Sequence, residues 1–503
     1  MAAERFDTII VGSGISGMTA GIILAGKGQR VLIIEQHAVP GGLTQTFRRE
    51  GLVFPTGVHR LGALNEKEPL WYFFNYLGLT DYLDLVPMAR DGFEIYYFPD
   101  CTVKVPQNHD QYKDKMKSMF PDNAPAIDRY FQDMAASIRH LALYNPGCEP
   151  GPDTSSRYLG ALDDYFENIG IKGRLKSILS ANNILFGLPS SQCPLLTHFL
   201  ITDAYLKSSF RINEQSTLFS QALSSRFTAL GGKIKTRAKM TRLMITDRAV
   251  QGVELEGGQI LEAPQVIYTG HPSRLPQYCP PKTFRPFYED RLATAQNTLG
   301  IFGVCLAWNQ THCPVTDSDA YIFNSWDVNA AYGIVEEELQ NLPDVIFLSA
   351  LPGPGTQLAV TALIPLKERT RHKHFREGSG QKGQTVYKKN KAILAEQVME
   401  RLEQVFPGTR ENARIVDTYS PATFERYTLT PEGSAYGIKK TAQEYLSTSF
   451  SPATRVKGLF LTGQSIGFCG IHGGISTSTG LCRGFFQEGE LMKNIVNQGL
   501  KKQ

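Results

Sequence analysis

The run Phe6-Asp-Thr-Ile-Ile-Val11, followed by Gly12-Ser-Gly14-Ile-Ser-Gly17 and then by a small, apolar segment that ends near Gly28, decides the fold. An apolar run, a glycine turn and an apolar segment of helical length predict a strand, a tight turn and a helix. A second apolar run, Arg30-Val-Leu-Ile-Ile-Glu35, completes a βαβ unit of about thirty residues. We therefore expect an α/β protein whose parallel sheet begins near the N-terminus.

The three glycines of this turn have separate roles in a dinucleotide-binding site. Gly12 allows the sharp turn, Gly14 lets the backbone approach a pyrophosphate, and Gly17 lets the helix pack closely on the strand. Glu35 ends the second strand, where a carboxylate accepts hydrogen bonds from ribose hydroxyls and disfavours a 2′-phosphate. The motif alone therefore predicts FAD or NAD and not NADP; a merely tight strand–helix turn is the structural alternative.

Further glycine-rich segments favour FAD over NAD. Of the 46 glycines, 20 lie in residues 1–62 and 458–489. Gly41-Gly42 and the later run Gly57-Val-His59 offer a second approach of backbone to a long dinucleotide, and residues 459–474 predict another strand, turn and helix start that bring donors to the flavin. The one other Gly-x-Gly-x-x-Gly, Gly378-Ser-Gly-Gln-Lys-Gly383, lies in a basic run and follows no predicted strand, so we do not expect a nicotinamide-binding domain of the familiar kind.

The composition is typical of a globular protein and excludes several other classes. The chain has 503 residues, 42% of them hydrophobic and 20% charged, which excludes a disordered or fibrous protein. The net charge of +4 is too small to argue for nucleic-acid binding. The eight cysteines have no metal-ligand spacing, so we expect reduced thiols and no metal site. We find no signal peptide and expect a cytoplasmic protein with at most peripheral membrane contact.

The order of predicted elements indicates two lobes. Residues 70–210 predict mainly helices and loops, whereas short strands are predicted between residues 231 and 268 and in parts of 280–450. A helical pattern of Leu394, Val398, Leu402 and Val405 ends before a proline. We expect a Rossmann-like FAD-binding lobe built from residues 1–70, 211–275 and 451–503, and a mixed α/β substrate-binding lobe built from residues 71–210 and 276–450.

Residues 367–391 form a basic run in which glycines are interspersed among lysine, arginine and histidine. The run is neither amphipathic nor uniformly basic, so we predict a solvated loop. A patch for anionic lipid or for a protein partner is the alternative.

These motifs together resemble the flavin-dependent amine oxidase-like superfamily, and within it the group of phytoene desaturases, carotenoid isomerases and retinol saturases. The stretches Phe54-Pro-Thr-Gly-Val-His-Arg-Leu-Gly62 and Ser420-Pro-Ala-Thr-Phe-Glu-Arg-Tyr-Thr428 are more similar to the retinol saturases than to the desaturases. The resemblance covers nearly the whole chain, and it is carried by residues 7–17, 35, 41–48, 57–59, 231–258, 419–427, 432–438 and 463–480.

The resemblance implies which residues bind FAD, with Met240 contacting the adenine through its backbone. The sequence departs from the family at Ser465, where an acidic residue commonly binds the ribityl chain. The implied cofactor residues are Gly12, Ser13, Gly14, Ser16, Gly17, Glu35, Gln36, Gly41, Gly42, Leu43, Thr44, Gly57, Val58, His59, Met240, Gly463, Gln464, Gly473, Gly474 and Ile475.

Two histidines are candidates for catalysis, because the resemblance places both beside the flavin. An imidazole with its ordinary pKa near ~6.5 suits either proton role at His59 and at His472, although each has a purely structural alternative. Tyr427 and Tyr436 are candidates for the wall of a substrate cavity, with packing as the favoured alternative. Cys469 is expected near the flavin without an acid–base partner.

The resemblance implies an FAD-dependent oxidoreductase that saturates or desaturates carbon–carbon double bonds of a polyene, an isoprenoid or another unsaturated lipid. Its electron partner would be a quinone, NAD(P)H or a small redox protein. The alternatives are a cis–trans isomerase that uses reduced FAD, an amine oxidase-like enzyme for a smaller polar substrate, and an isoprenoid-binding protein that resembles GDP-dissociation inhibitors and carries no flavin. The intact glycine motif argues against the last of these.

Overall fold

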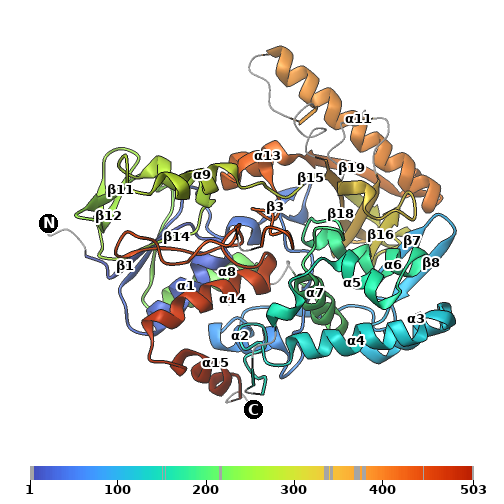
Figure 1. Cartoon of the computed structure of the whole chain (residues 1–503). Helices are drawn as coiled ribbons and strands as arrows, with labels where there is room; N and C mark the ends of the chain where they lie inside the picture. The colour runs from blue at the N-terminus through green and yellow to red at the C-terminus, as the bar shows by residue number, and fades with distance from the viewer. Residues whose placement is uncertain are drawn as a thin grey trace.

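The computed structural model describes residues 5–500 apart from residues 150, 153–154, 214–217, 333–338, 340–343, 368–373, 376–380 and 446. Its strands and helices alternate along the chain, so the α/β class is confirmed. Two sheets form the centre of the molecule, one of five strands and one of seven. Figure 1 shows them side by side, with helices packed around both.

The five-stranded sheet is parallel and is assembled from distant parts of the chain. Its inner strands are almost entirely buried, as parallel strands are when helices cover both faces. The two strands that the sequence assigned to a parallel sheet are present, and three of the strands predicted later in the chain join them. In spatial order the strands are β10 (Lys233–Lys235), β2 (Val31–Ile34), β1 (Thr8–Val11), β14 (Val266–Tyr268) and β20 (Leu459–Leu461).

Small residues let three helices pack closely at this sheet: α1 (Ile15–Gly26), α8 (Phe219–Ala229) and α14 (Gly470–Cys482). A Cβ atom on Gly21 would lie 2.9 Å from the side chain of Ile33 and 3.0 Å from that of Phe227. A Cβ atom on Gly474 would lie 2.8 Å from the side chain of Ile15. Helices α1 and α14 therefore run side by side, although they lie near opposite ends of the chain (Figure 1).

The seven-stranded sheet is antiparallel except for one parallel pair, β16 with β7. Two of its strands lie in the region for which the sequence predicted mainly helices and loops. Strand β7 is buried on both faces and so lacks the alternation that reveals a strand. The order is β19 (Ala413–Tyr419), β15 (Gly300–Asn309), β18 (Gln357–Leu366), β17 (Val345–Pro352), β16 (Asp319–Phe323), β7 (Glu94–Phe98) and β8 (Cys101–Val105).

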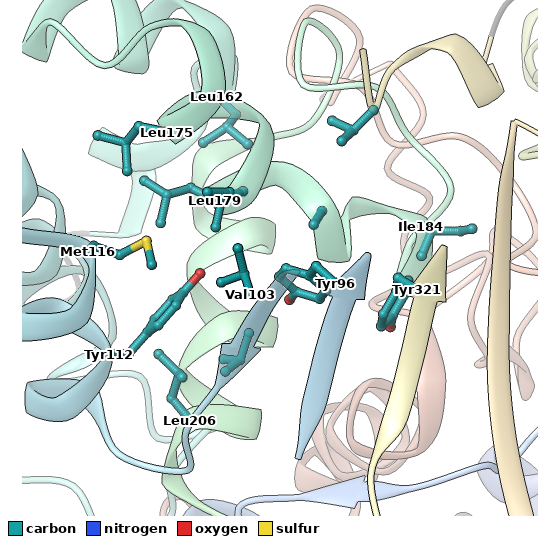
Figure 2. Close-up of a cluster of buried hydrophobic side chains, with 14 of the residues drawn as sticks. Tyr96, Val103, Tyr112, Met116, Leu162, Leu175, Leu179, Ile184, Leu206 and Tyr321 are labelled. Atoms are coloured by element: carbon teal, nitrogen blue, oxygen red, sulfur yellow. The ribbon is translucent and has the colours of Figure 1, made fainter. Parts of the chain in front are cut away.

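One face of this sheet carries a row of residues in register across all seven strands. Its middle members, Leu363, Phe347, Tyr321 and Tyr96, lie directly opposite one another on adjacent strands. Figure 2 shows Tyr96, Val103 and Tyr321 in the buried cluster that the sheet forms with the helices around it. The full row is Tyr419, Gly303, Leu363, Phe347, Tyr321, Tyr96 and Val103.

The remaining elements complete the fold, and their bounds are as follows. The smaller sheets are β3 (Thr46–Arg49) with β4 (Leu52–Pro55), β5 (Leu61–Gly62) with β9 (Ser209–Ile212) and β6 (Leu85–Pro87), and β11 (Met240–Thr246) with β12 (Ala249–Leu255) and β13 (Ile260–Glu262). The other helices are α2 (Pro69–Leu77), α3 (His109–Met119), α4 (Ala124–Ile138), α5 (Leu162–Ile169), α6 (Gly173–Ser180), α7 (Leu195–Lys207), α9 (Pro286–Thr294), α11 (Gln381–Val405), α12 (Thr409–Asn412), α13 (Pro421–Thr428) and α15 (Glu490–Leu500).

The basic run at residues 367–391 differs from its prediction. Residues 368–373 and 376–380 lie outside the described part, but α11 begins at Gln381, so the loop prediction is wrong from there onward. The helical pattern that starts at Leu394 continues this same helix toward the C-terminus and buries its apolar side chains against the seven-stranded sheet. None of the helices in the described ranges combines the length and the apolar character that crossing a bilayer requires.

A buried ionic network ties the segment after β4 to the seven-stranded sheet. Arg60 donates from Nη1 to Asp319 Oδ2 at 2.8 Å and from Nη2 to the Tyr321 hydroxyl at 3.0 Å, and it also pairs with Glu94. Arg211 donates to the other oxygen of Asp319 at 2.9 Å. Because two arginines face two carboxylates, the buried charges compensate one another.

Removing one charge from this network should be costly. Asp319→Asn leaves Arg60 and Arg211 facing a single carboxylate, so we expect the free energy of unfolding to fall by about 3–5 kcal/mol. The control is Asp7→Asn, which breaks the exposed Arg30–Asp7 pair and should cost about 1 kcal/mol or less. Denaturant unfolding measures both, and equal losses in the two variants would contradict the prediction.

Burial of His198 should make stability depend on pH. Desolvation lowers the pKa of His198 from 6.5 to about 3. Between these values the unfolded chain binds more protons than the folded chain, so stability decreases as the pH falls, by up to about 1.4 kcal/mol per pH unit. His198→Gln should therefore unfold with a weaker pH dependence than the wild type. His312→Gln, at an exposed position, is the control; the same pH dependence in all three proteins would contradict this.

Candidate cofactor and active site

A cavity of about 350 Å³ lies at the carboxyl ends of the parallel strands. Its wall includes Val11 at the end of β1, Glu35 after β2, Thr269 after β14 and Gly463 after β20. Crevices at the carboxyl ends of parallel strands are where α/β proteins bind dinucleotides. The sheet therefore brings the three glycine-rich segments of the sequence to one place.

The turn between β1 and α1 exposes backbone to this cavity. Gly12 has φ +101°, and a Cβ atom there would lie 2.4 Å from Thr269 Oγ1. A Cβ atom on Gly17 would lie 2.1 Å from the carbonyl oxygen of Gly12, so the helix begins in direct contact with the turn. A Cβ atom on Gly14 would meet nothing within 4 Å, which leaves its backbone open to a ligand. The free N–H groups at the start of α1 face the same space.

Glu35 is buried and held in a fixed orientation. One carboxylate oxygen accepts hydrogen bonds from Ser13 N at 3.1 Å and Ser13 Oγ at 2.5 Å, and the other accepts from His37 N at 2.9 Å. A carboxylate has about four acceptor positions, so one remains on the cavity side for a hydroxyl. The donors from Ser13 and His37 hold the carboxylate in place, and its remaining acceptor position fits a ribose hydroxyl of a dinucleotide.

The second glycine segment meets the first. Gly41 has φ +128° and donates from its backbone N to Ser13 Oγ at 2.9 Å. A Cβ atom on Gly42 would lie only 3.1 Å from the Cα of Gly14. Two glycine-rich stretches of backbone therefore lie side by side at the cavity. There they can approach the pyrophosphate of a dinucleotide and the ribityl chain attached to it.

The C-terminal segment closes the wall from the other side. Gly463 has φ +124°, and Gly470, Ile471 and Gly474 at the start of α14 line the cavity, so the positive end of this helix points toward it. Ser465 also lies on the wall, and its Oγ accepts a hydrogen bond from Ile438 N at 3.3 Å. Ser465, at which the sequence departs from the family that it resembles, is therefore hydrogen-bonded to the backbone of Ile438.

Most of the predicted cofactor residues lie on the cavity wall. Those on the wall are Gly12, Ser13, Gly14, Ser16, Glu35, Gln36, Gly42, Leu43, Thr44, Gly57, Val58, His59, Met240, Gly463, Gln464 and Gly474. Gly17, Gly41, Gly473 and Ile475 lie behind it. A Cβ atom on Gly473 would be 2.5 Å from the backbone of Phe468, and Ile475 belongs to the hydrophobic core, so both act through packing.

His59 lies on the wall with its ring edge against Phe347, at a centroid distance of 5.6 Å. Its Nδ1 is buried and has no hydrogen-bond partner in the structure. Burial lowers the pKa of His59 to about 4; Asp319 opposes this shift, and Arg60 and Arg211 add to it. The ring is therefore neutral at physiological pH, unlike the expectation of an ordinary pKa.

His472 has a different environment. Its Nε2 makes a hydrogen bond of 2.9 Å to the carbonyl oxygen of Tyr144, and its ring stacks on Tyr144 and contacts Phe73 edge-on. Burial lowers the pKa of His472 to about 4. Among the described residues that form the cavity wall, His472 does not appear. These contacts favour the structural role for this histidine.

Beyond the glycine segments, the wall of the cavity becomes apolar. Ile301 and Leu363 come from one face of the seven-stranded sheet, and Phe424, Ala435 and Tyr436 complete the wall. Tyr427 lies at the rim and is 51% exposed. The cavity thus has one end suited to a dinucleotide and another suited to an apolar molecule.

The sequence did not single out Lys440, which lies beside Cys469. Lys440 donates from Nζ to the carbonyl oxygen of Gly467. Burial lowers the pKa of Lys440 to about 7 and raises that of the Cys469 thiol to about 11. Neither residue lies on the described wall of the cavity. A lysine in a loop carries no sequence signal of burial, so only the fold reveals this pair.

Comparisons with known proteins support this picture. The family model described as flavin containing amine oxidoreductase matches residues 15–482. All-trans-retinol 13,14-reductase of Rattus norvegicus is 23% identical over 547 residues, covering 99% of this chain and 88% of the relative. Prolycopene isomerase 2 of an Oncidium hybrid cultivar is 22% identical over 513 residues, covering 92% of this chain and 80% of the relative.

The fold also occurs among solved structures. The structure of an oxidoreductase from Methanosarcina mazei superposes with a TM-score of 0.67 at 14% identity, covering 95% of this chain and all of that one (100%). The family match spans most of the chain, from the start of α1 to the end of α14. The chain therefore belongs to the flavin-containing amine oxidoreductase family, and its cofactor is FAD.

Proposed function

We propose that this protein is an FAD-dependent oxidoreductase that saturates or desaturates a carbon–carbon double bond of a polyene, an isoprenoid or another unsaturated lipid. The observation that carries the proposal is the apolar end of the cavity, where Ile301, Leu363, Phe424 and Ala435 adjoin the dinucleotide end. The names of the relatives, a retinol reductase and a prolycopene isomerase, support a substrate of this kind.

Each part of the cavity has a proposed role. The backbone at Gly12, Gly14 and Gly42 approaches the pyrophosphate, and Glu35 accepts from the ribose. Bound FAD supplies two-electron redox chemistry to a substrate carbon. The apolar wall orients the substrate and excludes water, which strengthens the polar contacts inside. His59 presents a neutral imidazole to the cavity and moves or holds a proton there.

The two sheets support the proposed division of the chain into an FAD-binding lobe and a substrate-binding lobe. The strands of the five-stranded sheet all fall within residues 1–70, 211–275 and 451–503, proposed as the FAD-binding lobe. The strands of the seven-stranded sheet all fall within residues 71–210 and 276–450, proposed as the substrate-binding lobe. We propose a quinone, NAD(P)H or a small redox protein as the electron partner.

The cavity wall offers an amine substrate no free carboxylate. A buried ammonium group needs a carboxylate or an aromatic cage, and the aromatic side chains Phe424, Tyr427 and Tyr436 do lie on the wall, so a small amine belongs in the test of function. Glu35 is the one acidic residue among the described residues of the wall, and it is engaged with Ser13 and His37. An isomerase that uses reduced FAD would use the same site as a reductase, so the products must distinguish these two reactions.

Product mass distinguishes the reactions. We expect reduced holoenzyme, incubated without oxygen with retinoids, carotenoids and unsaturated fatty acyl lipids, to convert a member of this panel into a product that has gained two hydrogens. An unchanged mass with a new retention time would instead identify an isomerase. No conversion across the panel, together with oxidation of a small amine, would overturn the proposal.

Replacing His59 tests its proposed role. His59→Phe keeps an aromatic ring against Phe347 but removes both nitrogens. We expect substrate-dependent reoxidation of the flavin to slow by about 100-fold or more, the usual range for loss of a general acid or base. The flavin absorbance should show that FAD is still bound. Wild-type reoxidation in this variant would remove His59 from the active site.

A further inference from the structure

Helix α13 and the residues after it cover one side of the cavity. We call residues 421–433, which comprise α13, a short link and the 3-10 turn Pro431–Gly433, the strap. The strap leaves the seven-stranded sheet after β19, and α13 contacts the turn Gly42–Thr44 that carries the second glycine segment. Its cavity-lining residues are Phe424, Tyr427, Thr428, Leu429 and Thr430.

The strap is anchored firmly where it begins. Ser420 caps α13 through a capping box with Thr423, and the Ser420 hydroxyl makes a hydrogen bond of 2.7 Å with the hydroxyl of Tyr387 on α11. This end therefore belongs to the framework of the seven-stranded sheet. The far end crosses to elements that surround the dinucleotide end of the cavity.

Three side chains hold that far end, and all of them reach main-chain carbonyls. His37 Nε2 lies 2.6 Å from the carbonyl oxygen of Tyr427, and Gln36 Nε2 donates to the same oxygen at 3.2 Å. Arg274 donates from Nε to the carbonyl oxygen of Leu429 at 2.6 Å. Because these contacts, which we call the clasps, bind the backbone, they fix the path of the strap and not merely one of its side chains.

The clasped path is strained. Leu429 has φ +56° and Glu432 has φ +62°, in the left-handed region that side chains other than glycine avoid. At Gly433, also at φ +62°, a Cβ atom would lie 1.8 Å from the carbonyl oxygen of Pro421, so the strap folds back against its own start. The clasps therefore hold the segment against a backbone preference for another conformation.

One clasp is connected directly to the ribose-facing carboxylate. His37 donates its backbone N–H to Glu35 at 2.9 Å while its ring reaches the strap. The rings of His37 and Tyr427 also contact each other, with centroids 5.3 Å apart. The carboxylate that fits the ribose and the ring that holds the strap thus belong to residues two positions apart, Glu35 and His37, in the segment directly after β2.

We propose that the strap is the outer wall of the FAD site and that the clasps from Gln36, His37 and Arg274 set how long FAD stays bound. The strap opens to let the cofactor pass and closes over the bound dinucleotide. This inference concerns the cofactor alone and does not depend on the substrate. Failure of the lipid panel would therefore leave it intact.

The release rate of FAD tests the proposal. Holoprotein is diluted far below the dissociation constant, and the fluorescence of the released FAD is followed with time. Arg274→Met loses one clasp and keeps the aliphatic stem, and His37→Phe loses another and keeps the ring contact with Tyr427. Hydrogen bonds from charged groups are the stronger ones, so we expect FAD release from Arg274→Met to be about tenfold faster, a change of about 1.4 kcal/mol.

Arg291→Met is the matched control. Arg291 on α9 also donates to a main-chain carbonyl, that of Ser447 at 2.6 Å, but it does not touch the strap. FAD release from this variant should be unchanged. Equal release rates in the wild type, the control and both clasp variants would overturn the proposal. If one clasp variant does not fold, the other decides the outcome, and a lower unfolding temperature of its apoprotein with wild-type FAD release also counts against the strap.

Discussion

The whole cofactor site depends on one contact between two pieces of backbone. The Cα of Gly17 lies so close to the carbonyl oxygen of Gly12 that any side chain at position 17 would place its Cβ 2.1 Å from that oxygen. This contact fixes the angle between β1 and α1, which directs the helix N-terminus into the cavity. Helix α14 then packs on α1 through Gly474 and Ser478, so the C-terminal segment reaches the same cavity.

The parts of the site that sequence predicts well are those in which local geometry demands a particular residue. A left-handed or crowded backbone position requires glycine, so the sequence itself indicates such positions, as at Gly12, Gly41 and Gly463. Glu35 is equally visible because it ends a strand at a set distance from the turn. These positions predicted the α/β class and the cofactor before any tertiary contact was known.

The other parts depend on neighbours that lie far away in the chain. Nothing around Arg60 indicates that Glu94 and Asp319 surround it, and His59 loses its ordinary pKa because of that setting. His472 lies in a glycine-rich motif, yet Tyr144, more than three hundred residues earlier, takes its hydrogen bond. The sequence indicated the strap only through the family resemblance of residues 419–427 and 432–438. Its clasps are hydrogen bonds to main-chain carbonyl oxygens, which every residue has, so they leave no signal in the sequence.

The spatial order of the five-stranded sheet has a consequence for folding. Strand β20 pairs with β14, and α14 lies against α1, so the wall of the cofactor cavity is incomplete until residues 459–482 have joined segments hundreds of residues away. Long-range pairing of this kind is slow. The cavity that receives FAD is therefore a late product of folding, whereas the βαβ unit at residues 8–34 needs only local contacts.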